Sequence, residues 1–184
     1  MLLWLDLETS GLDPHRHIIL EVACILTNDD LSEVASYDAV INPGVSDVLR
    51  LLALTSDDFV IDMHTKNGLV EEINLGATTS MAEAEKHILE MVEDIPKKEL
   101  ILAGNSVHFD RKFIDEYMPA LAKKLNYRIF DVRTLMQMEE FWAPGATEET
   151  ESVSVHRAMP DIEFSLRTAH KYKSLLEKVT ALSE

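Results

Sequence analysis

The sequence predicts an α/β fold in which helices flank a mixed sheet of about five strands. Three apolar segments near the N-terminus are joined by short connections, a pattern that favours an antiparallel meander. Two shorter apolar segments follow later and alternate with helical patterns, as in strand–helix units. The predicted strands cover 2–7, 18–27, 34–41, 100–103 and 128–132.

The helices are predicted from capping residues and from proline. Ser80 and Glu83 fit a capping box that opens a helix to about Ile95, directly before Pro96. Pro119 divides the next helical segment in two. Further helices are predicted over 107–118, 119–125, 134–142 and 159–179, and a broken helical pattern covers 46–75.

The segment 143–154 is predicted to be a loop, because it contains Pro144, Gly145 and an acidic run over 148–151. It is either a mobile cover near a site or an ordinary solvated loop, and the sequence leaves both open. The 184 residues contain no internal repeat and no linker, so we expect one domain over 1–184.

The composition is that of a globular protein, with 46% hydrophobic and 27% charged residues. The single cysteine, Cys24, excludes an intrachain disulfide and is expected to be a small buried hydrophobe. No segment resembles a signal peptide or is long enough for a membrane span, so we expect a cytoplasmic protein without membrane contact.

The formal net charge of -16 repels long nucleic acids unless a local patch or a bound metal reverses the field. It favours a small substrate, a protein partner or a metal-dependent site, but it does not exclude nucleic acid.

Two acids at the end of the first strand are the strongest functional signal. Asp6 and Glu8 follow the apolar run 1–5 and are two positions apart, so their side chains lie on the same face of the strand. Two neighbouring carboxylates repel each other unless a cation or a proton is present. We therefore expect a cation at this position.

Two further clusters place polar groups at the edges of elements. Asp110 falls in the first turn of a predicted helix, and Asp161 falls in the first turn of the last helix, just after His156. Taken singly, acids in a first turn simply complement the helix dipole, and a lone histidine in a loop usually has no function. Together, the three clusters are stronger evidence for a functional site than each is alone.

Four carboxylates and a nearby histidine are what two-metal phosphodiester hydrolysis requires. Mg²⁺ and Mn²⁺ prefer oxygen ligands, and two such ions about 3.5–4 Å apart hold the attacking and leaving oxygens of an in-line displacement. An imidazole that does not ligate the metals can take the proton of the attacking water.

This set, Asp6-x-Glu8, Asp110 and His156-x(4)-Asp161, resembles the three motifs of the DEDDh exonucleases. Within that superfamily the chain is similar to the oligoribonucleases. The landmarks that carry this closer resemblance are the segments 3–14, 64–70, 104–106, 117–119, 127–128 and 131–132 and the last motif, 156–161.

The resemblance implies a ribonuclease-H-like exonuclease fold and 3′→5′ trimming of short oligoribonucleotides to 5′-mononucleotides. It implies that Asp6, Glu8 and Asp161 ligate two divalent ions, Mg²⁺ or Mn²⁺, and that Asp110 completes the second site. His156 is then the general base. DNA in place of RNA as substrate stays open.

The resemblance also implies contacts to the substrate and a homodimer. Leu12 corresponds to a leucine that wedges against the bases, and Phe59 to its aromatic partner, although a core position for Phe59 is an equal alternative. The remaining matches are His64 and Ser106 near the substrate, and Tyr127 and Arg128 around the 5′ end of a dinucleotide in the dimer.

Three residues depart from the family pattern, and they leave a strict preference for dinucleotides in doubt. Phe109 replaces a glutamine and adds stacking surface. Arg133 replaces a small serine and adds a cation near the presumed phosphate-recognition region. Phe59 stands where the family usually has tryptophan.

Two other hypotheses are kept. The first is a proofreading-type exonuclease that acts on longer single-stranded DNA or RNA. The second is a catalytically inactive binding subunit of the same fold, whose acidic surface contacts a protein. The complete set of acids argues against the second hypothesis, because an inactive domain has no reason to keep repelling carboxylates together.

Overall fold

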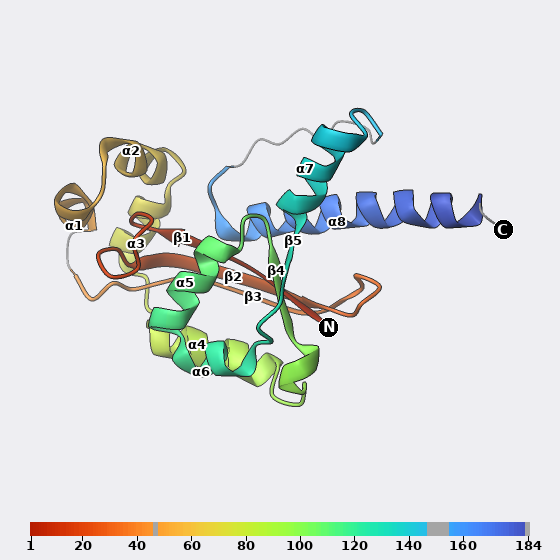
Figure 1. Ribbon diagram of the computed structural model, residues 1–184. Helices are drawn as coiled ribbons and strands as arrows, with labels where there is room; N and C mark the ends of the chain where they lie inside the picture. Colours follow the sequence, from red (N-terminus) through yellow and green to blue (C-terminus); the bar gives the residue numbers. More distant parts are fainter. Residues whose placement is uncertain (46–47, 147–154, 183–184) are drawn as a thin grey trace.

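The computed structural model describes residues 1–45, 48–146 and 155–182, and a five-stranded sheet lies at its centre (Figure 1). The strand order is β3-β2-β1-β4-β5, in which the first three strands are antiparallel and β4 and β5 run parallel to β1. The strands are β1 Leu2–Thr9, β2 Ile19–Thr27, β3 Glu33–Val40, β4 Ile101–Gly104 and β5 Ile129–Asp131. The predicted mixed sheet is therefore confirmed.

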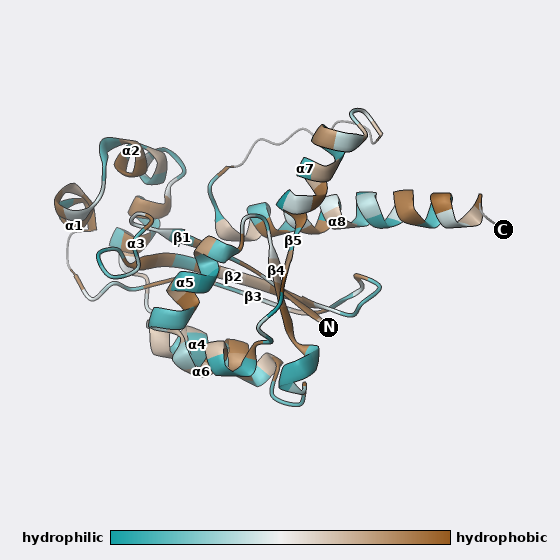
Figure 2. Ribbon diagram, in the orientation of Figure 1, coloured by the Kyte–Doolittle hydropathy of each residue, from teal (hydrophilic) through white to brown (hydrophobic). Residues whose placement is uncertain are grey.

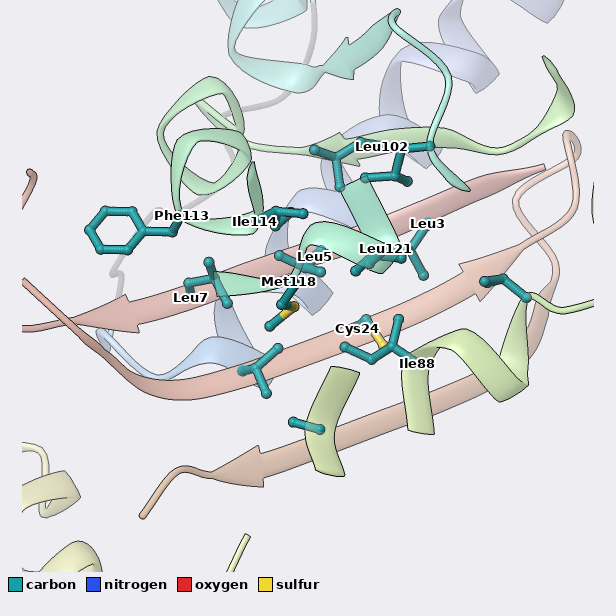
Figure 3. Close-up of a cluster of buried hydrophobic side chains, with 14 of the residues drawn as sticks. Leu3, Leu5, Leu7, Cys24, Ile88, Leu102, Phe113, Ile114, Met118 and Leu121 are labelled. Carbon is teal, nitrogen blue, oxygen red and sulfur yellow. The ribbon is translucent and has the colours of Figure 1, made fainter. Parts of the chain in front are cut away.

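The alternation of side chains along β1 divides the core into two layers. Leu3, Leu5 and Leu7 face one side, where they join the largest buried cluster together with Cys24 of β2 (Figure 3). Trp4 faces the other side and belongs to a second cluster. Asp6 and Glu8 continue the Trp4 side of the strand, so the two acids emerge together at its carboxyl end.

Helices cover both faces of the sheet. On the leucine face lie α4 (Met81–Met91), α5 (His108–Tyr117) and α6 (Pro119–Lys124), which contribute Ile88, Phe113 and Leu121 to the cluster in Figure 3. The opposite face is covered by α8 (Ala158–Ala181), which packs on β1 and β2. The short α7 (Val132–Trp142) contacts α8 (Figure 1).

A separate helical group lies at the end of the sheet where β1 finishes (Figure 1). It consists of α1 (Val48–Thr55), α2 (Asp58–Lys66) and α3 (Leu69–Gly76), and the predicted broken helical pattern is thus three short helices. Asp57 caps α2 by accepting a hydrogen bond from the Val60 N–H. The group has its own apolar cluster, formed by Leu20, Val48, Leu52, Leu69, Val70 and Ile73.

Most predicted boundaries agree with the structure within a few residues. The capping box of Ser80 and Glu83 is present, but α4 ends at Met91 and not near Ile95. The strand β5 is shorter than predicted because Asp131 already caps α7 by accepting from the Arg133 N–H. A 3-10 turn, η1 (Lys97–Glu99), precedes β4.

Hydropathy follows this architecture: brown colour runs along the central strands, and the two colours alternate along α8 (Figure 2). Among the described residues, no helix combines the length and the apolar character needed to cross a bilayer. Of the predicted loop over 143–154, the part over 147–154 lies outside the described residues.

Candidate active site

A cleft of about 680 Å³ lies where the carboxyl end of β1 meets the N-terminal ends of α5 and α8. It brings together all five residues of the predicted catalytic set. Asp6 and Glu8 come from β1, Asp110 from α5 and Asp161 from α8, while His156 lies just before α8. These residues are up to 155 positions apart in the sequence, since the set runs from Asp6 to Asp161.

Asp110 is fixed by the backbone of β1. The Leu7 N–H donates to its Oδ1 at 3.0 Å, which orients the carboxylate toward the end of the strand. This approach needs a compact turn between β4 and α5. At Gly104, an added Cβ would come within 3.0 Å of the Leu5 carbonyl oxygen and of Val107, so only glycine fits without displacement.

The segment before α8 is anchored by a buried ion pair. Glu21 lies opposite Glu8 in the β1–β2 ladder and is 5% exposed. Arg157 Nε donates to both carboxylate oxygens of Glu21 at 3.1 Å, and Arg157 Nη2 donates at 2.8 Å. The Ala158 N–H donates to the same carboxylate at 3.0 Å. Glu21 therefore fixes the chain between His156 and Asp161.

Two further contacts hold the same segment from the helical group. Arg157 also donates to Glu72 of α3 at 2.7 Å. The Asn67 side chain donates to the His156 carbonyl oxygen. His156 has a φ of +52°, a left-handed conformation that is uncommon for a residue other than glycine and that costs about 1 kcal/mol or more. The surrounding contacts hold the histidine in this conformation.

Three carboxyl groups in the cleft have raised pKa values, so their ionised forms are disfavoured unless a cation is bound. Burial raises the pKa of Asp6 well above its ordinary value, and the charges of Asp110, Glu8 and Asp161 raise it further. Burial followed by the charges of Asp161, Glu21 and Asp110 raises the pKa of Glu8 to about 8. Burial raises the pKa of Asp110 to about 7, against two backbone hydrogen bonds that lower it.

His64 lies behind Glu8 and does not relieve this repulsion. It is 0% exposed, and its Nε2 is 2.9 Å from the Thr9 carbonyl oxygen, which makes Nε2 the protonated nitrogen. Its Nδ1 is 3.9 Å from Glu8 Oε2 and makes no hydrogen bond within the described part of the chain. Burial lowers the pKa of His64, which favours the neutral ring.

The donor set fits a divalent metal. One carboxylate oxygen of Glu8 and one of Asp161 lie within 4.8 Å of each other, and a ring nitrogen of His156 lies beside them within the same distance. Asp6 and Asp110 line the same cleft. Carboxylate oxygens are the ligands that Mg²⁺ and Mn²⁺ prefer, and a bound ion would allow the buried acids to ionise at neutral pH.

Four of the predicted substrate contacts lie at this cleft or directly behind it. Leu12 and Phe59 line it and are 71% and 68% exposed, so the alternative core position for Phe59 is wrong. Ser106 also lines the cleft, and His64 packs behind Glu8. Phe109 adds a second aromatic ring to the lining.

The other three predicted contacts lie elsewhere. Tyr127 and Arg128 directly precede β5, so they lie at the N-terminal end of this strand, away from the carboxyl end of β1 that forms the cleft. Arg128 lies over the Tyr127 ring. Within one copy of the chain they do not line the cleft. Arg133 lines an adjoining hollow of about 330 Å³ together with Asp6 and Asp161, and it pairs with Glu140 at 3.3 Å.

Comparison with known proteins gives the family. The exonuclease family model (RNase T) matches residues 3–168. An oligoribonuclease of Corynebacterium diphtheriae is 38% identical over 176 residues, which cover 94% of this chain and 81% of that protein. This chain belongs to the exonuclease family and, within it, to the oligoribonucleases.

Other oligoribonucleases match over the same span. That of Pseudomonas aeruginosa PAO1 is 34% identical over 173 residues, covering 94% of this chain and 93% of its own. A probable oligoribonuclease of Dictyostelium discoideum is 35% identical and covers 94% of this chain and 88% of its own.

Solved structures of exonuclease I share the fold of this oligoribonuclease-family chain. The zinc-bound E. coli enzyme with single-stranded DNA has a TM-score of 0.71 at 16% identity, and that of Methylocaldum szegediense has 0.70 at 18%. Both superpose on 98% of this chain, which spans 42% of their own length. The predicted ribonuclease-H-like exonuclease fold is confirmed.

The sequence does not reveal the residues that hold the predicted catalytic set in place. Glu21 interrupts the apolar run of the predicted strand 18–27, and a buried acid in such a run is itself a signal for a buried partner. Nothing in the sequence pointed to Arg157 as that partner, because 136 positions separate the two. Asn67 lies in the landmark segment 64–70, but the sequence does not indicate its contact with His156.

Proposed function

We propose that this chain is a metal-dependent 3′→5′ exoribonuclease that degrades short oligoribonucleotides, dinucleotides included, to 5′-mononucleotides. One observation carries the proposal: four acids and one histidine from three separate segments line a single cleft in a chain of the oligoribonuclease family.

Asp6, Glu8, Asp110 and Asp161 would hold two divalent ions, Mg²⁺ or Mn²⁺. When bound, these ions polarise the scissile phosphate and lower the pKa of the attacking water. The ions would supply positive charge to acids whose ionised form is disfavoured in the cleft, because burial, with neighbouring carboxylates as a smaller cause, raises the pKa values of Asp6, Glu8 and Asp110.

His156 would act as the general base that takes the proton of the attacking water. Its position supports this role, because a ring nitrogen lies within 4.8 Å of oxygens of Glu8 and Asp161. The ion pair of Glu21 and Arg157 holds the backbone on which the imidazole is mounted, and the ring thus needs little rearrangement on binding.

Leu12 and Phe59 would contact the bases of the substrate. Both are apolar and exposed within the cleft, and stacking of a base on an aromatic ring contributes about 1–3 kcal/mol. A short oligonucleotide also suits the net charge of -16, since it carries few phosphates for the surface to repel.

Tyr127 and Arg128 would act across a homodimer. Tyr127 is 79% exposed and lies away from the cleft of its own chain, so it reaches a substrate only if a second copy supplies it. Sedimentation of the full chain tests this part: a dimer is expected, and Tyr127→Ala in that dimer should raise the KM. A monomer with full dinucleotide activity would contradict it.

A length series of single-stranded substrates tests the function. With Mg²⁺ or Mn²⁺, labelled RNAs of two to about twenty nucleotides should release 5′-mononucleotides from the 3′ end, and the shortest should react fastest. The same series in DNA measures the preference for the sugar. A protein that leaves all of these substrates intact would refute the proposal.

A second candidate is an exonuclease for longer single strands. Phe109 favours it, because its ring is 40% exposed beside Ser106 in the open cleft and offers stacking surface for a further base. A rate that rises with substrate length in the same series supports this candidate over the first.

A further inference from the structure

His17 lies at the edge of the cleft, between the loop that carries Leu12 and the segment that carries Phe59. Its side chain lines the cleft and is half-buried. The hydrolysis proposed above gives this imidazole no role, and none of the sequence motifs includes it. Its contacts nevertheless connect the two parts of the cleft that would grip the bases.

The two ring nitrogens of His17 are bonded to the main chain of different segments. Nε2 lies 2.9 Å from the Thr55 carbonyl oxygen, which can only accept, so Nε2 carries a proton. Nδ1 lies 3.0 Å from both the N–H and the carbonyl oxygen of Asp13, and the Asp13 N–H donates to it. The ring therefore connects the residue after Leu12 to the last residue of α1.

The same ring packs against the residue before Leu12. A Cβ added to Gly11 would lie 2.5 Å from Cδ2 and Nε2 of His17, and Gly11 has a φ of +154°. Only glycine permits both the conformation and the close approach. The imidazole thus contacts both neighbours of Leu12 in the sequence.

Further hydrogen bonds fasten this loop on both sides. The Tyr117 O–H of α5 donates to the His17 carbonyl oxygen at 2.7 Å. The Ser56 O–H donates to the Ser10 carbonyl oxygen at 2.6 Å. Leu12 and Phe59 are themselves largely exposed, so these backbone contacts, and not side-chain packing, set the distance between them.

We propose that His17 is a positioning residue that fixes the separation of Leu12 and Phe59 and thereby the width of the base-binding part of the cleft. The inference rests on the proposed function, in which those two side chains contact the bases. Loss of the bridge lets the loop move relative to α1 and α2. Stacking weakens steeply with separation, so substrate binding suffers and the chemistry at the metals does not.

The test measures kcat and KM on a dinucleotide for His17→Ala in the full chain. We expect KM to rise about tenfold and kcat to change less than threefold, because about 1.4 kcal/mol of stacking corresponds to tenfold in binding. His15→Ala is the matched control: His15 lies in the same loop, is exposed, and pairs only weakly with Glu116 at 3.7 Å. It should leave both constants unchanged.

Two additional comparisons separate positioning from a general loss of structure. In a Leu12→Ala background, His17→Ala should raise KM less than twofold, because the contact it positions is already absent. His17→Gln should have a KM much closer to that of the wild-type protein than His17→Ala has, since its amide can reach Thr55. His17→Asn, which is too short, should behave like alanine. Melting temperatures of all variants are measured alongside.

An unchanged KM in folded His17→Ala, or an equal rise in the Leu12→Ala background, would overturn the inference while leaving the proposed function intact. If the wild-type protein neither binds nor cleaves a dinucleotide, the proposed function fails, and the role of His17 fails with it.

Discussion

Arg157 and Glu21 form a two-point ion pair directly beside the acidic cleft. Arg157 Nη2 lies 2.8 Å from Glu21 Oε1, and Nε lies 3.1 Å from both carboxylate oxygens. Arg157 neutralises the charge of Glu21, which faces Glu8 across the β1–β2 ladder, and the pair positions the segment that carries His156 and Asp161 at the cleft. Hydrogen bonds of this bidentate, charged kind are among the strongest in proteins.

Arg157→Met is therefore expected to damage both stability and catalysis. It leaves Glu21 buried without its partner, which typically costs about 3–5 kcal/mol, and it releases the segment that carries His156. Urea denaturation and kcat on a dinucleotide measure the two effects. Asp62→Ala, which breaks an exposed pair with Lys66, is the control and should cost less than about 1 kcal/mol. Stability equal to that of the control would show that the pair has no anchoring role.

The stability of the metal-free protein should fall as the pH rises. The folded-state pKa of Glu8 is raised to about 8 and that of Asp110 to about 7, both above their ordinary values of 4.5 and 3.8. A raised carboxyl pKa contributes stability that is fully present below the unfolded value and is lost as the pH rises through the folded value. We expect a loss on the order of a few kcal/mol between about pH 4 and pH 8.

Divalent metal should remove this dependence. Denaturation in EDTA and in Mg²⁺, at several pH values, measures it. With Mg²⁺ the melting temperature near pH 8 should rise the most, because the ions replace the protons on the acids. A metal-free stability that is flat across the range, or one that rises toward pH 8, contradicts the electrostatic account of the cleft.

Phe59→Ala should weaken substrate binding without affecting the fold. The ring is 68% exposed, so its removal should cost less than about 1 kcal/mol of stability, while loss of base stacking should raise KM about tenfold. Leu54→Ala removes a similarly exposed side chain of α1 that does not line the cleft. If the two variants show the same KM, Phe59 does not contact the bases.

Arg133→Ser should reduce the contribution of phosphate to binding. Arg133 is the one arginine or lysine among the residues that line either the cleft or the adjoining hollow within the described chain. Loss of one phosphate contact should make the negative slope of log K for substrate binding against log salt concentration shallower by about one unit. Arg167→Ser removes an exposed cation of α8 as the control. An unaltered slope would place Arg133 outside the substrate path.

The position of Asp6 and Glu8 could be predicted because it depends on local rules. An apolar run followed by acids at alternate positions fixes both the strand and the face, and the capping box of Ser80 and Glu83 fixes the start of a helix in the same way. The family motifs supplied Asp110, His156 and Asp161, and the structure brings all of these residues to one cleft.

The contacts that orient the site could not be predicted because they join distant segments. Glu21 and Arg157 are 136 positions apart, and Tyr117 reaches the backbone of His17 over 100 positions. No local pattern specifies such partners, since each depends on how the sheet, α5 and α8 pack. The helix boundaries near Ile95 and Asp131 were missed for a smaller reason, the choice of capping residue at each end.

The most direct test of metal-dependent hydrolysis at this cleft is the release of labelled 5′-mononucleotide from a dinucleotide. It is measured for the wild-type protein and for Asp6→Asn, in Mg²⁺, Mn²⁺ and EDTA. Asp38→Asn, an exposed acid on β3, is the control. We expect metal-dependent release by wild type and the control, and at least about 10³-fold less by Asp6→Asn, on the scale of a lost transition-state interaction. Equal release by Asp6→Asn, or release that persists in EDTA, would contradict the metal-dependent mechanism at this cleft.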